Sequence, residues 1–401
     1  MRKPKAFIIG EKMITKISGG TIISDGKKFR ADVYIKDGVI EAVTCENLSF
    51  DTEIDASGKY VSPGFIDAHI HGAAGYDFLD NTEEAFLKIS EECAKHGTTT
   101  IIPTVTSSTK QMMIDALNTF EKVKNLKVNG AEMPGIHFEG PYFSPVQKGA
   151  QDEKYLRNFD PKEYKEILNM TDSIIRWTGA PELDGSEAFA KSLCEKGILP
   201  CIGHSNANSD EVKAAFENGF THITHLYSCT STVHRKNAFR YAGIVEAAYL
   251  NDEMSVEIIA DGIHLPSDLL KLVYKIKGAD KTILVTDSMR GAGMPNGESV
   301  LGGLKDGLKV IIEDGVAKLP DRTAFAGSVA SSDRLVKNMV NMADVPLESA
   351  ILMITKTPAK IMRLEKKGII RKGYNADIVI FDDCINIERT IVGGRTVYIN
   401  D

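Results

Sequence analysis

The sequence of 401 residues lacks the features that mark several large classes of protein. No apolar run approaches the roughly 18 residues that a membrane-spanning helix requires, so we expect no membrane partner. Basic charge is not in excess, because the chain has 48 Lys and Arg but 55 Asp and Glu, which gives a net charge of −7. This balance argues against nucleic-acid binding. The six cysteines show no CxxC spacing, so we expect reduced thiols that mostly pack in the interior of a cytoplasmic protein.

Internal repeats and low-complexity tracts are also missing. Hydrophobic residues make up 43% and charged residues 26% of the chain, which is typical of a folded globular protein. The segment Met1–Glu11 starts with basic residues, but its apolar run is too short for a signal peptide. The chain is therefore expected to fold into one or more cytoplasmic domains.

Both ends of the chain are typical of short strands joined by tight turns. Lys16–Ile23 and Ala31–Val43 are apolar or alternating, with turn signals at Gly26 and Gly38. Asn375–Asp382 is predicted as a buried strand and Ile391–Ile399 as a hairpin. Neither end has enough apolar surface to fold alone, so residues 1–61 and 364–401 are predicted to form one small β-sandwich domain.

Residues 62–363 alternate between apolar strand patterns and helical patterns. Eight such units favour an α/β fold, a (β/α)8 TIM-like barrel, over an open sheet. A hairpin over Leu304–Leu319 is predicted as an insertion. The predicted strands are Tyr60–Ile66, Thr98–Val105, Gly135–Phe138, Ile174–Thr178, Leu199–Gly203, Thr221–Thr224, Ser255–Ala260 and Ile283–Thr286.

Polar side chains follow these strands where each one ends. A barrel enzyme carries its active site at this face, contributed by several strands. Imidazoles and carboxylates that converge on one mouth are typical ligands of a divalent transition metal. The strand-end residues of this kind are Asp67, His69, His71, Glu139, His204, His225, Asp261, His264 and Asp287.

Each candidate also has an ordinary structural interpretation. One His-x-His pair in a chain with nine histidines arises by chance in roughly one case in five. Single buried histidines are more often structural than ligands. Five of the nine histidines fall at strand ends, however, and this joint pattern favours a metal site. Among the others, His96 is predicted as structural, His222 as a packing residue, and His137 as either core or support for the site.

These residues, in this order, resemble the amidohydrolase superfamily and, more narrowly, its N-acetylglucosamine-6-phosphate deacetylases. The resemblance covers nearly the whole chain. The pattern of His137–Pro141 followed by Ala260–His264 is specific to the deacetylases, whereas His69 and His71 mark only the superfamily. The matching segments are Val33–Ile40, Pro63–Gly72, His137–Pro141, Lys148–Ala150, Gly203–Ser205, Thr224–Tyr227, Ala260–His264, Thr286–Arg290, Ala326–Ser328 and Gly373–Asp382.

The resemblance implies hydrolysis of N-acetylglucosamine 6-phosphate, or of a close N-acetylhexosamine phosphate, to acetate and the amino sugar phosphate. It implies a homodimer and one or two divalent ions per chain, with Zn, Fe, Mn, Co and Ni all open. Glu139, His204 and His225 are implied to hold the main ion, His69 and His71 a second, and Asp287 to act as general acid and base. Implied substrate contacts are Ala150, Gln151, Ser228, Cys229, Asp261, His264, Phe325, Ala326 and Gly327.

The chain departs from the family pattern at two places. Ser228 and Cys229 stand where the family usually has Asn-Ala, and Gln151 stands where some members have a histidine that polarises the acetyl carbonyl. Gln151 still offers hydrogen-bond donors. Arg235 and Lys236 lie in the loop after the sixth strand and suit a phosphate, because a guanidinium donates two hydrogen bonds at once. The alternative interpretation is that both residues belong to a solvated surface loop.

Two other functions stay open. One is another amidohydrolase, acting on an N-acyl amino acid or a cyclic amide. The other is a non-catalytic barrel paralogue that serves as an interaction module. The deacetylase-type pattern around Glu139 counts against the first, and the intact candidate ligands with Asp287 count against the second.

Overall fold

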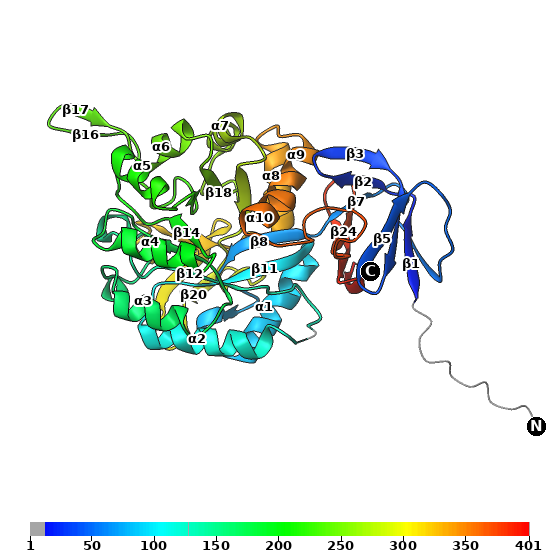
Figure 1. Ribbon diagram of the computed structural model, residues 1–401, viewed down its shortest axis with the longest axis horizontal. Coiled ribbons are helices and arrows are strands. Elements are labelled where there is room, and N and C mark those ends of the chain that lie inside the picture. Colours follow the sequence, from blue (N-terminus) through cyan, green and yellow to red (C-terminus); the bar gives the residue numbers. More distant parts are fainter. Residues whose placement is uncertain (1–12, 127, 401) are drawn as a thin grey trace, which may run out of the picture.

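Eight parallel strands form a barrel at the centre of the structure, a computed structural model that describes residues 13–126 and 128–400 (Figure 1). The strands follow one another in chain order, and an isolated bridge from Ile70 to Ser288 joins the first strand to the end of the last. The predicted (β/α)8 barrel is confirmed. Its strands are β8 (Phe65–Ile70), β11 (Thr98–Val105), β12 (Ile136–Glu139), β13 (Ile174–Gly179), β14 (Leu199–Ile202), β15 (His222–Ile223), β18 (Ser255–Ile259) and β19 (Thr282–Val285).

Amphipathic helices surround the barrel and bury their apolar faces against it (Figure 1). The first begins after Thr82, whose side chain caps it by accepting a hydrogen bond from the backbone of Ala85. The helices are α1 (Glu83–Lys95), α2 (Lys110–Val123), α3 (Pro161–Leu168), α4 (Ser186–Glu195), α5 (Ser209–Glu217), α6 (Ile244–Leu250), α7 (Ser267–Lys277), α8 (Ser332–Asn341), α9 (Leu347–Ile354) and α10 (Lys356–Ile361).

Strands from both ends of the chain build a second, smaller domain of two sheets around its own apolar core (Figure 1). The predicted domain boundary at residue 61 falls inside β7, which joins β2 on one side and β24 on the other. One sheet contains β1 (Ile14–Ser18), β4 (Asp32–Lys36), β5 (Val39–Thr44) and β6 (Thr52–Asp55). The other contains β2 (Thr21–Ser24), β3 (Lys27–Arg30), β7 (Tyr60–Pro63), β24 (Ile378–Phe381), β25 (Ile387–Val392) and β26 (Arg395–Ile399).

Two predicted strands are each divided in two. The range Tyr60–Ile66 is interrupted at Gly64, where a Cβ would approach the Oγ1 atom of Thr99 to 2.1 Å, so β7 and β8 belong to different sheets. The range Lys16–Ile23 is interrupted at Gly19, whose φ of +76° lets the chain turn from β1 to β2. Both single-strand predictions were therefore wrong.

Three smaller sheets accompany the barrel. The predicted insertion is a four-stranded sheet of β20 (Gly297–Leu301), β21 (Leu308–Glu313), β22 (Val316–Lys318) and β23 (Phe325–Ser328). A hairpin of β16 (His234–Lys236) and β17 (Phe239–Tyr241) projects from the barrel, with every residue of both strands exposed (Figure 1). Shorter elements are β9 (Gly72–Ala73), β10 (Tyr76–Asp77) and the 3-10 turns η1 (Phe78–Asp80), η2 (Pro145–Gln147) and η3 (Glu153–Tyr155).

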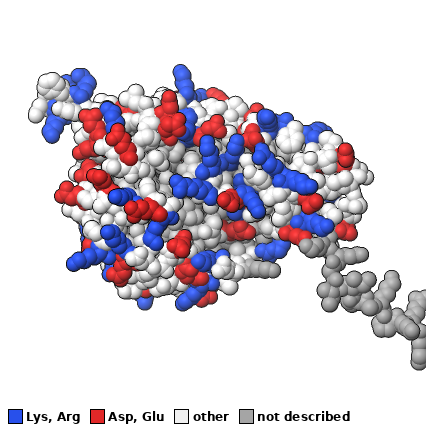
Figure 2. All heavy atoms as spheres, in the orientation of Figure 1, with Lys and Arg blue, Asp and Glu red and all other residues white. Residues whose placement is uncertain are grey.

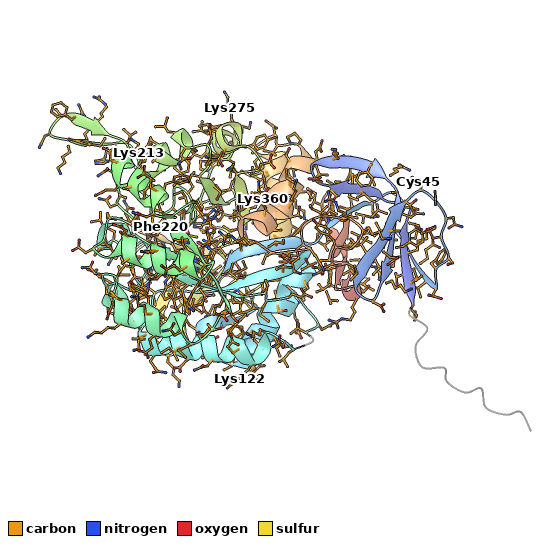
Figure 3. The ribbon with its side chains drawn as sticks, viewed as in Figure 1. Cys45, Lys122, Lys213, Phe220, Lys275 and Lys360 are labelled. Carbon is orange, nitrogen blue, oxygen red and sulfur yellow. The ribbon has the colours of Figure 1, made fainter. Side chains whose placement is uncertain are left out.

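All six cysteines are free thiols, but the expectation that most are buried was wrong. Only Cys93 and Cys201 are buried, whereas Cys45 lies exposed in the small domain (Figure 3). Within the described part of the chain, none of the helices has both the length and the apolar composition needed to cross a bilayer. The segment Met1–Glu11, for which no signal peptide is predicted, lies outside the described residues.

Candidate active site

A cavity of about 330 Å3 opens at the carboxyl ends of the barrel strands. His69 and Ala326, also predicted for the site, are buried behind its surface, and Asp261 accepts a hydrogen bond from the His264 ring at 2.8 Å. The structure therefore brings most of the predicted residues together. Those that line the cavity are His71, Glu139, Ala150, Gln151, His204, His225, Ser228, Cys229, His264, Asp287, Phe325 and Gly327.

Four imidazoles converge on the carboxylate of Glu139, each through its Nε2 atom. The Oε1 atom lies 2.8 Å from His225, 3.3 Å from His204 and 3.5 Å from His69. The Oε2 atom lies 3.3 Å from His71. All five side chains are nearly inaccessible to solvent, so the cluster forms one buried group at the floor of the cavity.

The other ring nitrogen of each histidine is held by an acceptor. Nδ1 contacts the backbone carbonyl of Thr104 in His71, of Gln147 in His204 and of Ser228 in His225, at 2.9–3.2 Å. A carbonyl oxygen can only accept, so these Nδ1 atoms each carry a proton, and Nε2 is the ring nitrogen that faces Glu139. The Nδ1 atom of His69 instead lies 2.7 Å from the carboxylate of Glu257.

This donor set fits a divalent transition metal. Neutral imidazole nitrogens and a carboxylate are the ligands that such ions prefer, and fixed Nδ1 protons direct the Nε2 atoms inward. Two groups of three possible ligands have their ligand atoms within 4.8 Å of one another, and both include Glu139. They are His69 with His71 and Glu139, and Glu139 with His204 and His225.

Asp287 approaches the same cluster from the end of β19. Its Oδ1 atom lies 3.2 Å from Nε2 of His71 and 3.4 Å from Nε2 of His69. Burial alone would raise the pKa of Asp287, but the charge of His69 and the hydrogen bond to His71 hold it below its usual value. Burial likewise opposes ionisation of Glu139, whose pKa the surrounding imidazoles hold well below its usual range.

Three of these residues adopt a backbone conformation that side chains other than glycine rarely take. The φ angles are +46° at His204, +28° at His225 and +47° at Asp287. Left-handed geometry at non-glycine residues costs on the order of 1–3 kcal/mol each and concentrates at functional sites. The sharp turn at these strand ends directs the side chains over the barrel axis.

The walls of the cavity combine polar anchors with apolar surface. Gln151 accepts hydrogen bonds from Thr106 and from the backbone of Ser107, and it donates one to Glu139. The ring of His264 packs against Phe325 with centroids 4.7 Å apart. Since Phe325 belongs to β23, the inserted sheet supplies one wall of the cavity.

Arg235 and Lys236 do not line the cavity of their own chain. They lie on β16 in the exposed hairpin, where Arg235 faces Arg240 across the strand pair. Figure 2 shows basic side chains at the projecting end of the hairpin. Within one chain, the structure therefore separates these two residues from the other site residues.

His137 and His222 are both buried within the barrel. His137 lies between Thr104 and Thr178, at 3.1 and 2.8 Å, and burial holds its pKa well below the usual value. His222, predicted as a packing residue, contacts Ser255 at 2.8 Å and the Oε2 atom of Glu257 at 3.2 Å. It therefore takes part in a polar network as well as in packing.

Sequence reasoning missed several residues around the site. Thr106, Leu301 and Ala324 also line the cavity, and no sequence pattern distinguished them. Tyr227 lines it too, and it ends the matching segment Thr224–Tyr227, although no role was predicted for it. Glu257 and Arg176 form a fully buried ion pair with 2.6 Å between Oε2 and Nη1. A signal for this pair was present, because each is the lone charged residue in an apolar strand.

A (β/α)8 barrel whose mouth gathers four imidazoles around one carboxylate is typical of a metal-dependent hydrolase. The sequence model described as the Amidohydrolase family matches residues 60–397. The chain belongs to the amidohydrolase family.

Among curated relatives, the chain is 33% identical to the N-acetylglucosamine-6-phosphate deacetylase of Lysinibacillus sphaericus, over 93% of this chain and 94% of that one. Among solved structures, the enzyme of that name from Thermotoga maritima matches with a TM-score of 0.85 and 30% identity, over 96% of this chain and all of that one. A mutant of the Mycobacterium smegmatis deacetylase, solved with N-acetyl-D-glucosamine-6-phosphate, matches with a TM-score of 0.87 and 25% identity, over 97% and 100%.

Proposed function

We propose that this chain is a metal-dependent deacetylase that hydrolyses the N-acetyl group of N-acetylglucosamine 6-phosphate. The products are acetate and glucosamine 6-phosphate. The observation that carries the proposal is the convergence of four imidazoles and Asp287 on Glu139 inside a cavity large enough for a sugar. Relatives named for this activity align over more than nine-tenths of the chain.

Glu139, His204 and His225 would hold one divalent ion, and His69 and His71 would hold a second that shares Glu139. Such an ion polarises a bound carbonyl and lowers the pKa of water toward about 7. The chemistry of the donor set suits Zn, Fe, Mn, Co and Ni alike. The residues therefore support a metal requirement of one or two ions per chain.

Asp287 is assigned the proton transfers. Its carboxylate accepts the proton of the attacking water as the new C–O bond forms at the acetyl carbonyl. It then gives this proton to the amide nitrogen as the C–N bond breaks, so that the amino sugar leaves as an amine and acetate remains. A low pKa suits the first of these steps, because the group must start as a carboxylate.

Three side chains are assigned to the substrate. Gln151 has one amide proton engaged with Glu139, which leaves the other free to donate to the acetyl group. The His264 ring is held by Asp261 and can orient a sugar hydroxyl. Phe325 and its neighbours Ala326 and Gly327 exclude water on the side of the inserted sheet.

The phosphate is assigned to the β16–β17 hairpin of a second copy in a homodimer. The hairpin carries Arg235 and Lys236 away from the cavity of its own chain, and it also exposes Phe239, at 71%. Apolar and basic groups on one projecting hairpin suit contact with another copy and with a phosphate. We place the enzyme in the cytoplasm, where all six free thiols would stay reduced.

The test is acetate release from a panel of substrates by metal-loaded protein. N-acetylglucosamine and N-acetylgalactosamine, each with and without the 6-phosphate, would be compared with an N-acyl amino acid and a cyclic amide. We expect the highest kcat/KM with N-acetylglucosamine 6-phosphate. A preference for the amino acid or cyclic amide would favour another amidohydrolase, and the absence of all turnover would favour a non-catalytic paralogue.

A further inference from the structure

We propose that Glu257, itself held by Arg176, is a positioning residue that sets the orientation of His69 and so controls binding of the second ion. The inference rests on the proposed function, because it takes His69 as a ligand. It goes beyond that function, because it proposes that a side chain outside the cavity determines how tightly one of the two metal positions is occupied. Glu257 lies on β18 and is fully buried below the histidine cluster.

One carboxylate oxygen of Glu257 serves two of the candidate ligands. Its Oε1 atom lies 2.7 Å from Nδ1 of His69 and accepts a hydrogen bond from the backbone N–H of His225 at 3.1 Å. The first contact fixes the orientation of the His69 ring. The second ties the position of Glu257 to the neighbouring ligand, so the carboxylate has little freedom to shift.

His69 differs from the other three histidines in what holds it. Backbone carbonyls hold His71, His204 and His225, and these acceptors are fixed by the fold. A carboxylate is a stronger acceptor, and its contact is the shortest of the four. A carboxylate on Nδ1 also makes the Nε2 lone pair a better metal ligand. The affinity of the second metal position therefore depends on the side chain of Glu257, which a substitution can change.

Arg176 keeps Glu257 in place as an acceptor. Its Nη1 atom donates to Oε2 of Glu257 at 2.6 Å, and Nη2 donates to Thr224 at 3.0 Å. The buried Nε atom has no hydrogen-bond partner among the described residues, which costs free energy. Buried ion pairs are seldom better for stability than apolar residues of the same volume, so the geometry points to a role in positioning.

His222 offers a matched control, because it contacts the same carboxylate from the other side. Its Nε2 atom lies 3.2 Å from Oε2 of Glu257, and its ring is as deeply buried as that of His69. The substitution His222→Asn disturbs the same buried network without touching His69. A purely structural role for the network predicts the same result for His222→Asn and for variants of Glu257.

The decisive variant is Glu257→Gln, which keeps the shape and removes one acceptor. Its amide nitrogen must then face either Arg176 or His69, and Arg176, which can only donate, takes the remaining oxygen. His69 then loses its acceptor, and the backbone N–H of His225 loses the same oxygen. We expect the second ion to bind roughly 10–100-fold more weakly, with the ion at Glu139, His204 and His225 retained.

The test is Zn2+ titration by equilibrium dialysis, which gives the affinities of both ions in wild type, Glu257→Gln and His222→Asn. His69→Gln, which removes the proposed ligand itself, defines the result for complete loss of the second position. The double variant Arg176→Met/Glu257→Gln, which removes both charges, replaces Glu257→Gln if the latter fails to fold.

The possible results separate this inference from the proposed function. An unchanged affinity for the second ion in the Glu257 variants, or an equal loss in His222→Asn, would overturn the positioning role. A wild-type protein that releases acetate with a single ion would also overturn it and leave the deacetylase assignment standing. A wild-type protein that binds two ions in the expected pattern but releases no acetate would support positioning and remove the proposed function.

Discussion

The side-chain amide of Gln151 donates a hydrogen bond from Nε2 to the Oε2 atom of Glu139, at 2.9 Å. Its orientation is fixed, because Oε1 accepts from Thr106 at 2.7 Å and from the backbone N–H of Ser107 at 3.0 Å. The residue predicted to contact the substrate thus also holds the carboxylate on which the four imidazoles converge. One amide connects the loop after β12 to the centre of the site.

The substitution Gln151→Ala is expected to lower both metal affinity and kcat/KM by roughly 10–100-fold, the usual range for a group that supports a ligand. Glu139 would lose its fixed hydrogen-bond donor, and the acetyl group would lose the second amide proton. Metal titration and acetate release measure the two effects. Gln147→Ala, in the same loop, removes only a contact to Asn206 and should leave both unchanged. Equal values for Gln151→Ala and wild type would contradict this role.

The substitution Asp287→Asn is expected to lower kcat by roughly 10²–10⁴-fold or more, because an amide keeps the shape but cannot accept a proton. Thermal stability and the ion at Glu139, His204 and His225 should change little. Steady-state acetate release and metal analysis would check this. Activity within a few-fold of wild type would show that Asp287 is a structural carboxylate.

Removing His69 and His71 together should remove one ion. The Nε2 atoms of these two residues lie 3.2 Å apart beside Glu139, an arrangement suited to a shared ion. Elemental analysis after reconstitution with excess metal should approach two ions per chain in wild type and one in the double variant with alanine. A wild-type value near one ion per chain would instead indicate that His69 and His71 support the site without binding a second ion.

Replacing Arg235 by alanine should lower kcat/KM about ten- to a hundredfold for the phosphorylated sugar, from a loss of roughly 1.5–3 kcal/mol in a charge-assisted contact. The unphosphorylated sugar should show almost no change. Lys275→Ala, on the exposed side of α7, is the control for a general loss of surface charge (Figure 3). An equal effect on both substrate forms would show that the hairpin has only a structural role.

Stability should depend on pH through His96, the C-cap residue of α1. Burial opposes its charge, but the carboxylates of Asp333, hydrogen-bonded at 3.1 Å, and of Glu92, 3.7 Å away, raise the pKa of His96 to about 9. A raised pKa stabilises the folded state fully below the unfolded value of about 6.5, and this contribution disappears as the pH rises through about 9.

His96→Gln should therefore lower the melting temperature near pH 6 and have no effect near pH 10. The expected loss in the free energy of unfolding near pH 6 is about 1 kcal/mol, because solvent screens the partly exposed ring. Thermal unfolding of both proteins at the two pH values gives the comparison. A difference that persists at the higher pH would assign the effect to packing rather than to charge.

The barrel was predictable because its strands are buried on both faces. Thr98–Val105 was predicted to the residue, since a run rich in β-branched residues, between Gly97 and a polar segment, is typical of a strand. The β16–β17 hairpin was not predicted, because all its residues are exposed and no hydrophobic alternation marks it. Gly64 and Gly19 each divided a predicted strand for reasons of close approach and backbone angle that appear only in three dimensions.

The candidate ligands were predictable for a different reason. Parallel strands of a barrel end at one face, so residues such as Glu139 and His225 meet although they are 86 positions apart. The support of His69 by Glu257 was not predictable, because it joins residues 188 positions apart through the register of the barrel. The position of Arg235 outside the cavity of its own chain was not predictable, because it follows from a projecting hairpin that no sequence pattern marked.

The pairing of β7 with β24 has a consequence for synthesis of the protein. Pro63 on β7 pairs with Ile378 on β24, so β7 can complete its pairing only after more than 300 further residues have been made. At roughly 5–20 residues per second, the ribosome needs about 15–60 s to supply it. During that interval one edge of β7 is unpaired. An unpaired strand edge can pair with another chain, which promotes aggregation. The barrel strands are all made before β24, so the barrel can form while the small domain still lacks its later strands.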